Sequence, residues 1–146
     1  MRTTETTIYK FTELPEEAQQ KAVEKLFDIN VNYEWWDTTL DDAATIGLKI
    51  ETFDTERHDI TGDLMYDPAR VKQLVMEHHG KVCDTYKYVM GFDMRTNVDN
   101  HDFEYGLLQE YLSMLRREFE YQTSEEAIIE TILANEYEFY IDGELI

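Results

Sequence analysis

Apolar residues recur every three or four positions along much of this chain, which is the spacing of an amphipathic helix. The clearest case is residues 101–121, where a wide apolar stripe predicts one long helix. The stripe consists of Phe103, Leu107, Leu108, Tyr111, Leu112, Met114, Leu115 and Phe119. The same spacing predicts helices at 15–29, 33–46 and 68–79, and a further helix after Thr123.

Local signals place the starts of three of these helices. Pro15 suits a first helical turn, where its missing N–H leaves no hydrogen bond unmade. Asp67 followed by Pro68 predicts a capped start for the third helix. Thr123 and Glu126 have the spacing of a capping box, which predicts the start of the last helix.

Alternation of apolar and polar residues predicts a few short strands. Strands are expected at 8–11, at 48–53 with a partner at 57–66, and on either side of Asp142 and Gly143, a pair typical of a type I′ hairpin turn. Residues 81–95 fit a helix better than a strand, and residues 97–100 are expected to form a loop. We therefore expect residues 1–146 to form a single compact α+β domain, helix-rich, with a small antiparallel sheet and a C-terminal hairpin.

The charge of the chain restricts its partners. Its 146 residues include 32 Asp and Glu and 13 Lys and Arg, a net charge of −19 at pH 7. Residues 101–146 alone hold twelve acids and two bases. Such a field repels nucleic acid and anionic membranes, since both bind proteins through Lys and Arg. A basic protein is therefore the expected partner; the alternative is that the acids only keep a small protein soluble.

Catalytic motifs are missing from the sequence. The six glycines are scattered singly and form no phosphate-binding loop, and no Gly-x-Ser-x-Gly motif is present. His78, His79 and Cys83 are the best metal candidates, with His58 or Asp84 as a fourth ligand, but their spacing is not that of known zinc sites. The alternative is the end of a helix at which His78 packs on the apolar face and His79 is solvated. We expect a protein that is not an enzyme and that needs no cofactor or metal.

Two interpretations of Cys83 are open: it is a nucleophile beside His78 or His79, or it is a small buried apolar residue. Because it is the only cysteine, it excludes an internal disulfide. The first ten residues lack the apolar run of a signal peptide, and no run approaches the length of a membrane helix. The expected location is the cytoplasm.

The acidic residues of the last third are the expected binding face. Glu136 and Glu138 lie two apart in an expected strand, so they should project together, opposite Tyr137 and Phe139. Carboxylates on such a face can stand where the phosphates of a nucleic acid would sit; the alternative is an ordinary solvated face. The expected acidic contact residues are Glu104, Glu110, Glu118, Glu120, Glu125, Glu126, Glu130, Glu136 and Glu138.

Trp35 and Trp36 are the second expected contact. On a helix their rings diverge by about 100°, so one can anchor the core while the other covers an edge. An exposed Trp is a typical hot-spot residue of a protein interface. The alternative is that both rings pack against the first helix and the sheet.

Several segments of the chain resemble a family of small acidic phage and prophage proteins of unknown function, some of them loosely labelled antitoxin-like. The resemblance covers most of the chain except about 56–100, and Pro15 stands where the family often has Ser. The similar segments are residues 9–18 (YKFTELPEEA), 34–37 (EWWD), 42–43, 46–54 (IGLKIETFD), 115–121, 123–132 and 134–139.

The resemblance implies phage origin and brings no catalytic motif with it. By analogy with small acidic phage proteins that act against host defence, we expect a phage-encoded, non-enzymatic inhibitor acting in the cytoplasm of the bacterial host. Its partner is expected to be a host defence protein, basic or nucleic-acid-binding, and neither nucleic acid itself nor a membrane. The alternative function is that of an antitoxin-like protein that neutralises a cognate toxin.

Overall fold

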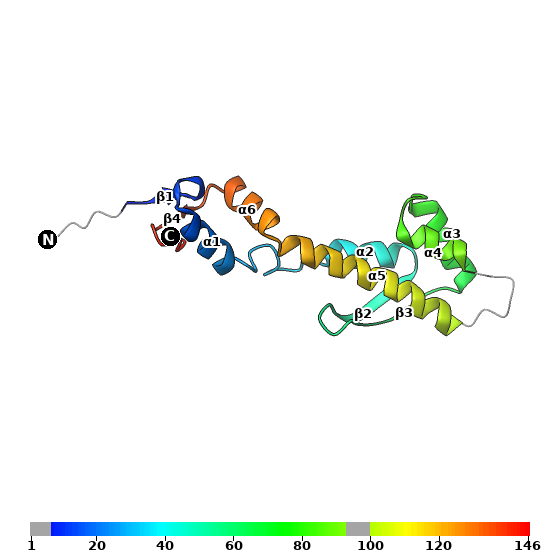
Figure 1. The fold of residues 1–146 in the computed structure, drawn as a ribbon. Helices are drawn as coiled ribbons and strands as arrows, with labels where there is room; N and C mark the ends of the chain where they lie inside the picture. The colour runs from blue at the N-terminus through cyan, green and yellow to red at the C-terminus, as the bar shows by residue number, and fades with distance from the viewer. Residues whose placement is uncertain (1–6, 93–99) are drawn as a thin grey trace. The chain divides into compact units, whose positions relative to one another are not determined.

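The computed structural model describes residues 7–92 and 100–146. Six α-helices, one short 3₁₀ helix and two two-stranded antiparallel sheets make up this part of the chain (Figure 1). The predicted helix-rich α+β class with small antiparallel strands is confirmed. The 97–100 loop of the prediction falls largely outside the described residues.

Contacts within the chain group its residues into two compact units. We call them the terminal unit, residues 1–35 and 120–146, and the central unit, residues 36–119. The sequence analysis treated the chain as a single domain and did not anticipate this grouping. Each unit is described below by itself.

The central unit begins with helix α2 (Asp37–Thr45). Two residues after the helix, Gly47 has a left-handed backbone conformation with φ of 88°. Strands β2 (Leu48–Asp54) and β3 (Asp59–Leu64) then form the predicted hairpin, with Leu48 opposite Leu64 and Asp54 opposite Asp59. Helix α3 (Pro68–His78) starts as predicted, because the Asp67 carboxylate accepts a hydrogen bond from the Arg70 N–H at 2.9 Å.

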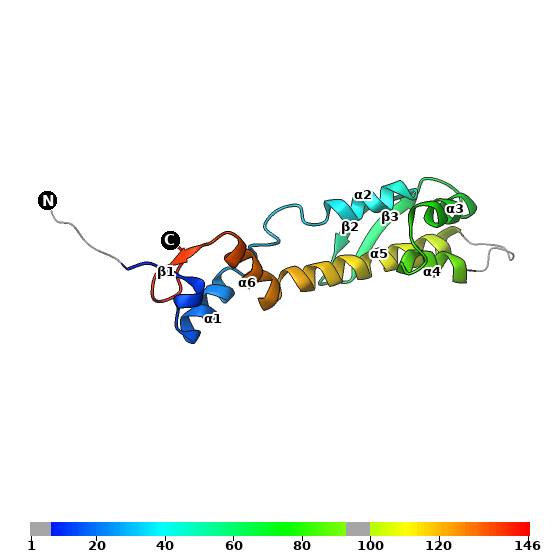
Figure 2. The ribbon, with the colours of Figure 1, turned by 90° about the horizontal axis from the view of Figure 1, so that it is seen from above.

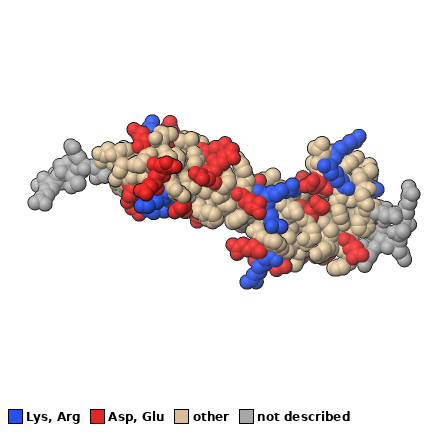
Figure 3. Space-filling view, viewed as in Figure 1, with Lys and Arg blue, Asp and Glu red and all other residues tan. Residues whose placement is uncertain are grey.

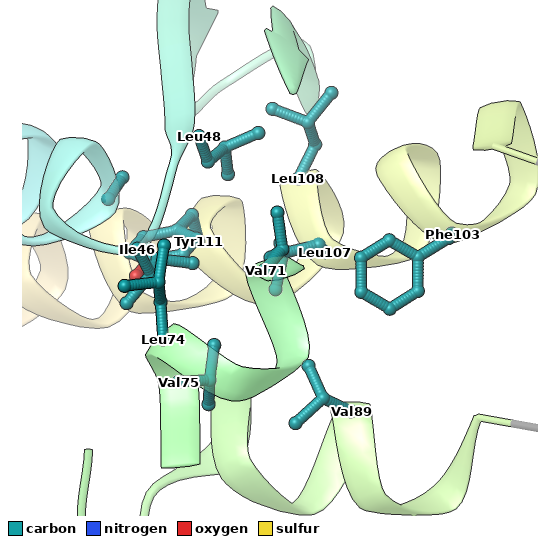
Figure 4. Close-up of a cluster of buried hydrophobic side chains, with 11 residues drawn as sticks. Ile46, Leu48, Val71, Leu74, Val75, Val89, Phe103, Leu107, Leu108 and Tyr111 are labelled. Carbon is teal, nitrogen blue, oxygen red and sulfur yellow. The ribbon is translucent and has the colours of Figure 1, made fainter. Parts of the chain in front are cut away.

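Helix α4 (Asp84–Gly91) and the long helix α5 (Asn100–Gln122) complete the central unit as far as Phe119. The apolar stripe of α5 contributes Phe103, Leu107, Leu108 and Tyr111 to the core, where they meet residues from α3, α4 and β2 (Figure 4). Of the predicted stripe, Met114 and Phe119 are only half-buried. The helical period of α5 thus explains why four other elements pack along it.

The terminal unit joins the two ends of the chain. Strand β1 (Tyr9–Lys10) pairs with β4 (Glu138–Phe139), and the 3₁₀ helix η1 (Phe11–Glu13) leads into α1 (Glu16–Lys25). Helix α6 (Glu125–Ala134) lies beside them in both ribbon views (Figures 1 and 2). Together they bury a second core around Phe11, Leu14, Ala18, Ala22, Ile128, Ile132 and Phe139.

The C-terminal hairpin forms, but its turn differs from the prediction. A type I′ turn needs positive φ at both central residues, and here Gly143 has φ of 89° whereas Asp142 does not have positive φ. The Gly143 N–H donates to the Tyr140 carbonyl at 2.9 Å, and the Tyr140 N–H donates to the Glu144 carbonyl at 2.8 Å. This pattern is that of a three-residue loop closed by a glycine in the left-handed region.

Two helix boundaries also differ from the prediction. Helix α1 ends at Lys25 and not at residue 29, because the buried Asn30 donates to the Gln122 carbonyl and accepts from the Thr131 hydroxyl, so this segment bonds to other elements. The cap of α6 is Ser124 and not Thr123, since the Ser124 hydroxyl accepts from the Ala127 N–H at 3.3 Å.

Candidate functional site

Acidic side chains are concentrated in the terminal unit. It holds fifteen acids and four bases, net −11 in 62 residues, whereas the central unit holds seventeen acids and nine bases, net −8 in 84 residues. Figure 3 shows acidic side chains spread over the surface of the molecule, with fewer basic ones among them. The terminal unit therefore carries the higher density of negative charge.

All fourteen acidic side chains of the terminal unit that the structure describes are exposed. Three bases, Lys10, Lys21 and Lys25, accompany them, and within residues 7–35 and 120–146 the one ion pair joins Lys25 to Glu144 at 3.3 Å. We call these side chains the acidic set. The acidic set consists of Glu13, Glu16, Glu17, Glu24, Asp28, Glu34, Glu120, Glu125, Glu126, Glu130, Glu136, Glu138, Asp142 and Glu144.

Six of the nine predicted acidic contact residues belong to the acidic set, and three do not. Glu104, Glu110 and Glu118 lie on α5 in the central unit and are half-buried. Glu104 accepts a hydrogen bond from the Leu64 N–H at 3.3 Å, so it helps to hold β3 against α5. These three carboxylates are therefore not part of the exposed acidic face that the sequence predicted, whereas Glu120, which lies on the same helix, is exposed.

Glu136 and Glu138 are both exposed, but not for the predicted reason. Only Glu138 lies in strand β4, whereas Glu136 precedes the strand with a left-handed φ of 52°. Strand alternation therefore does not set the direction of both side chains. Tyr137 is half-buried and Phe139 is buried, as expected.

The two tryptophans do not lie on a helix. Helix α2 starts at Asp37, and Trp36 is the residue that precedes it. Both side chains are half-buried, and the Trp36 ring meets Phe53 edge to face with centroids 5.8 Å apart. Trp35 belongs to the terminal unit and Trp36 to the central unit, and helical divergence does not set the direction of their rings, because both precede α2.

The central unit contains a pocket of about 350 Å³ on which polar side chains from four helices or helix ends converge. The residues that line it are Asp42, His79, Val82, Cys83, Asp84, Thr85, Met114 and Arg117. Arg117 and Asp84 form an ion pair across it at 2.8 Å. Sequence analysis named three of the lining residues, His79, Cys83 and Asp84, as metal candidates, but it did not connect them with Asp42.

His79 is the centre of a buried polar network in this pocket. Its Nε2 lies 3.0 Å from an Asp42 carboxylate oxygen, and its Nδ1 lies 2.5 Å from the Thr85 hydroxyl. The Tyr111 hydroxyl donates to the other Asp42 oxygen at 2.9 Å. Burial, and then the neighbouring Asp42 carboxylate, raise the pKa of Tyr111 far above its usual value, so this hydroxyl stays protonated as a donor.

The Thr85 hydroxyl, the His79 imidazole and the Asp42 carboxylate are connected in the order of a catalytic triad, but their geometry does not support catalysis by these three groups. Thr85 is only 2% exposed, so its hydroxyl cannot reach a substrate. Both ring nitrogens of His79 are already hydrogen-bonded, which leaves neither to take a proton from Cys83. The network instead connects α2, the end of α3, α4 and α5.

The expected roles of His78 and Cys83 change as well. His78 is exposed and does not share the apolar face of α3, whereas the side chain of its neighbour His79 is only 7% exposed. Cys83 is exposed at the start of α4, so it is not a buried apolar residue. Among the described residues no group of three or more His, Cys, Asp and Glu side chains has the arrangement of a metal site.

A helix that could span a membrane, long and apolar enough, does not occur in the described part of the chain. Comparison of the chain with family models, curated proteins and solved structures found no match.

Proposed function

We propose that this chain is a non-enzymatic protein that binds a basic partner protein through the acidic set of the terminal unit. The observation that supports the proposal is that fourteen exposed carboxylates share this unit with three described bases and one ion pair. Carboxylates crowded without counter-charges repel one another, and a basic partner relieves that repulsion. Complementary charge also speeds association and makes it sensitive to salt.

A structural role accounts for some of these acids. Glu13, Glu16, Glu17, Glu125 and Glu126 lie in first turns of η1, α1 and α6, where negative charge stabilises the helix dipole. The other nine acids of the set have no such explanation. Glu130 lies in the middle of α6, and the others lie near the ends of helices, in loops and on β4; these nine are the part of the set that supports binding.

The resemblance to phage proteins gives the proposal its finer form. We propose that the chain is made by a phage and acts in the cytoplasm of the bacterial host. The proposed partner is a nucleic-acid-binding protein of a host defence system, in which the acidic set occupies the groove that receives phosphates. An antitoxin-like role against a cognate toxin is the alternative.

The test uses two variants of equal net charge. The terminal variant replaces Glu24, Asp28, Glu120 and Glu138 by Gln or Asn. These residues lie outside first helical turns, and the hydrogen bonds described for three of them are accepted by the backbone carbonyl and not by the side chain. The central variant replaces Asp41, Glu51, Glu56 and Asp59, which are exposed in the other unit. Both variants carry −15 in place of −19.

Each protein is immobilised and exposed to a bacterial lysate at low salt, and retained proteins are identified by mass spectrometry. We expect the native chain and the central variant to retain the same basic nucleic-acid-binding protein, and the terminal variant to lose at least nine-tenths of it. Added DNA should compete with the native chain for that partner. Equal loss with both variants would contradict the proposal, because it would show that net charge alone governs retention.

A further inference from the structure

A small pocket opens in the terminal unit between η1 and the C-terminal end of α6. Its volume is about 150 Å³, which in a protein interior is enough for a group the size of benzene. The pocket therefore has room for one side chain. Its walls are formed by Lys10, Phe11, Thr12, Ile132, Leu133, Glu136 and Tyr137.

Glu136 occupies a backbone position that favours glycine. The Tyr137 N–H donates to the Ile132 carbonyl at 3.3 Å and the Glu136 N–H donates to the Leu133 carbonyl at 3.2 Å, which is the Schellman pattern at the end of a helix. In that pattern the residue equivalent to Glu136 is usually glycine, because its φ is positive, here 52°. The chain thus keeps a carboxylate at the pocket despite backbone strain, and such strain is typical of binding sites.

The surroundings of Glu136 favour a cation. Helix α6 has no basic residue in its last turn, so the negative end of its dipole is not neutralised there. Among the described residues, Lys10 is the one cation that lines the pocket, and its charge is offset because Glu138 lies directly opposite it in the β1–β4 pairing. A guest side chain with a positive end therefore meets a negative potential at Glu136.

The remaining walls favour an apolar or aromatic contact. Leu133 is 48% exposed although its neighbour Ile132 is buried, so a guest side chain can cover apolar surface that is now in water. Phe11 and Tyr137 provide aromatic rings beside it. A planar guanidinium is less strongly hydrated than an ammonium and stacks on such rings.

We infer that this pocket receives one arginine side chain of the basic partner, with its stem against Leu133 and its guanidinium at the Glu136 carboxylate. The inference rests on the proposed function and names the residue that anchors the partner. It predicts that the acidic set attracts the partner over a distance, whereas the pocket fixes one arginine in place.

The experiment is an NMR titration of the native chain with N-acetyl-arginine amide, N-acetyl-lysine amide and N-acetyl-citrulline amide, which has the shape of arginine without its charge. We expect arginine amide to shift the backbone amides of Phe11, Leu133 and Tyr137, and to bind at least five times more tightly than citrulline amide. Lysine amide should bind more weakly than arginine amide, because it lacks the planar group.

Three variants distinguish the contribution of the Glu136 carboxylate to binding from any effect on folding. Glu136→Gln keeps the backbone strain and should weaken arginine amide binding at least fivefold. Glu136→Gly removes both strain and carboxylate; it should melt at a higher temperature than the native chain and still lose the binding, which excludes misfolding as the cause. Glu51→Gln, an equal loss of charge on β2 in the central unit, should change the affinity less than twofold.

Unchanged arginine amide binding in Glu136→Gln, or shifts confined to residues outside the pocket, would overturn the inference. The proposed function fails separately. If the pocket titration is negative but the terminal variant still loses its lysate partner, only the arginine pocket is wrong. If arginine amide binds as expected but the lysate partner is retained equally by the terminal and central variants, only the acidic-set proposal is wrong.

Discussion

At the scale of single residues, Glu110 shows how burial and charge act on one carboxyl group. It is half-buried on α5, and burial raises its pKa above the usual value. The charge of Asp84 raises the pKa of Glu110 further, while Arg117 opposes the rise. The folded state therefore prefers the protonated form of Glu110 more than the unfolded state does.

This preference determines the direction in which the free energy of unfolding changes with pH. A raised pKa in the folded state contributes stability below the unfolded pKa, near 4.5, and that contribution is lost as the pH rises through the folded value. We therefore expect Glu110→Gln to increase the free energy of unfolding at pH 7 and to have a smaller effect near pH 4. Urea unfolding at the two pH values measures it, with the exposed Glu51→Gln as control. A destabilised Glu110→Gln variant at pH 7 would contradict the argument.

At the same scale, the sequence pattern predicted the wrong environments for His78 and His79. Helical spacing put His78 on the apolar face and His79 in solvent, but α3 ends at His78 and His79 has an extended backbone, with φ of −109° and ψ of 142°. Beyond the last residue of the helix, the helical period no longer predicts the direction in which a side chain points. The partner of His79, Asp42, lies 37 residues away, and nothing in the local pattern connects the two.

At the scale of elements, the patterns that succeeded are those that depend on neighbouring residues. The stripe of α5, the Asp67 cap of α3 and the β2–β3 hairpin all follow from short-range spacing and are confirmed. The end of α1 could not be predicted in this way. It depends on the hydrogen bond that Asn30 donates to the Gln122 carbonyl and on the one that it accepts from the Thr131 hydroxyl, about a hundred residues further along the chain.

The start of α6 gives a prediction at the same scale. The Ser124 hydroxyl caps the helix, whereas the Thr123 hydroxyl donates to the Glu120 carbonyl at 3.4 Å, at the end of α5. Ser124→Ala should therefore lower the free energy of unfolding by about 1 kcal/mol, the usual cost of losing a cap.

Thr123→Ala is the matched control for this change, and we expect it to cost less than half as much. Chemical denaturation of both variants measures the difference. If Thr123→Ala proves the more costly substitution, the capping box expected from Thr123 and Glu126 describes the helix better than the Ser124 cap does.

At the scale of the whole molecule, the charge could be counted from the sequence but its grouping could not. Sequence analysis found the six acids of the acidic set that lie in residues 120–138 and missed all six from residues 13–34. The two stretches belong to one unit because β1 pairs with β4 and because η1 and α1 share a core with α6. Pairing between the two ends of a chain leaves no signal in local hydrophobic periodicity.

The same grouping predicts how the stability of the protein responds to salt. Repulsion among carboxylates destabilises the folded state, and it is strongest where the charge is densest, which is the terminal unit. At low salt the terminal variant should therefore melt at a higher temperature than the central variant, although both carry −15. A difference of about 1 kcal/mol corresponds to about 4 °C in Tm for a chain of this size.

At 1 M NaCl the screening length falls to about 3 Å, so the melting temperatures of the terminal and central variants should converge. Thermal unfolding followed by circular dichroism at 20 mM and 1 M NaCl measures both, and a difference that persists at 1 M NaCl would show that the substitutions act through packing and not through charge.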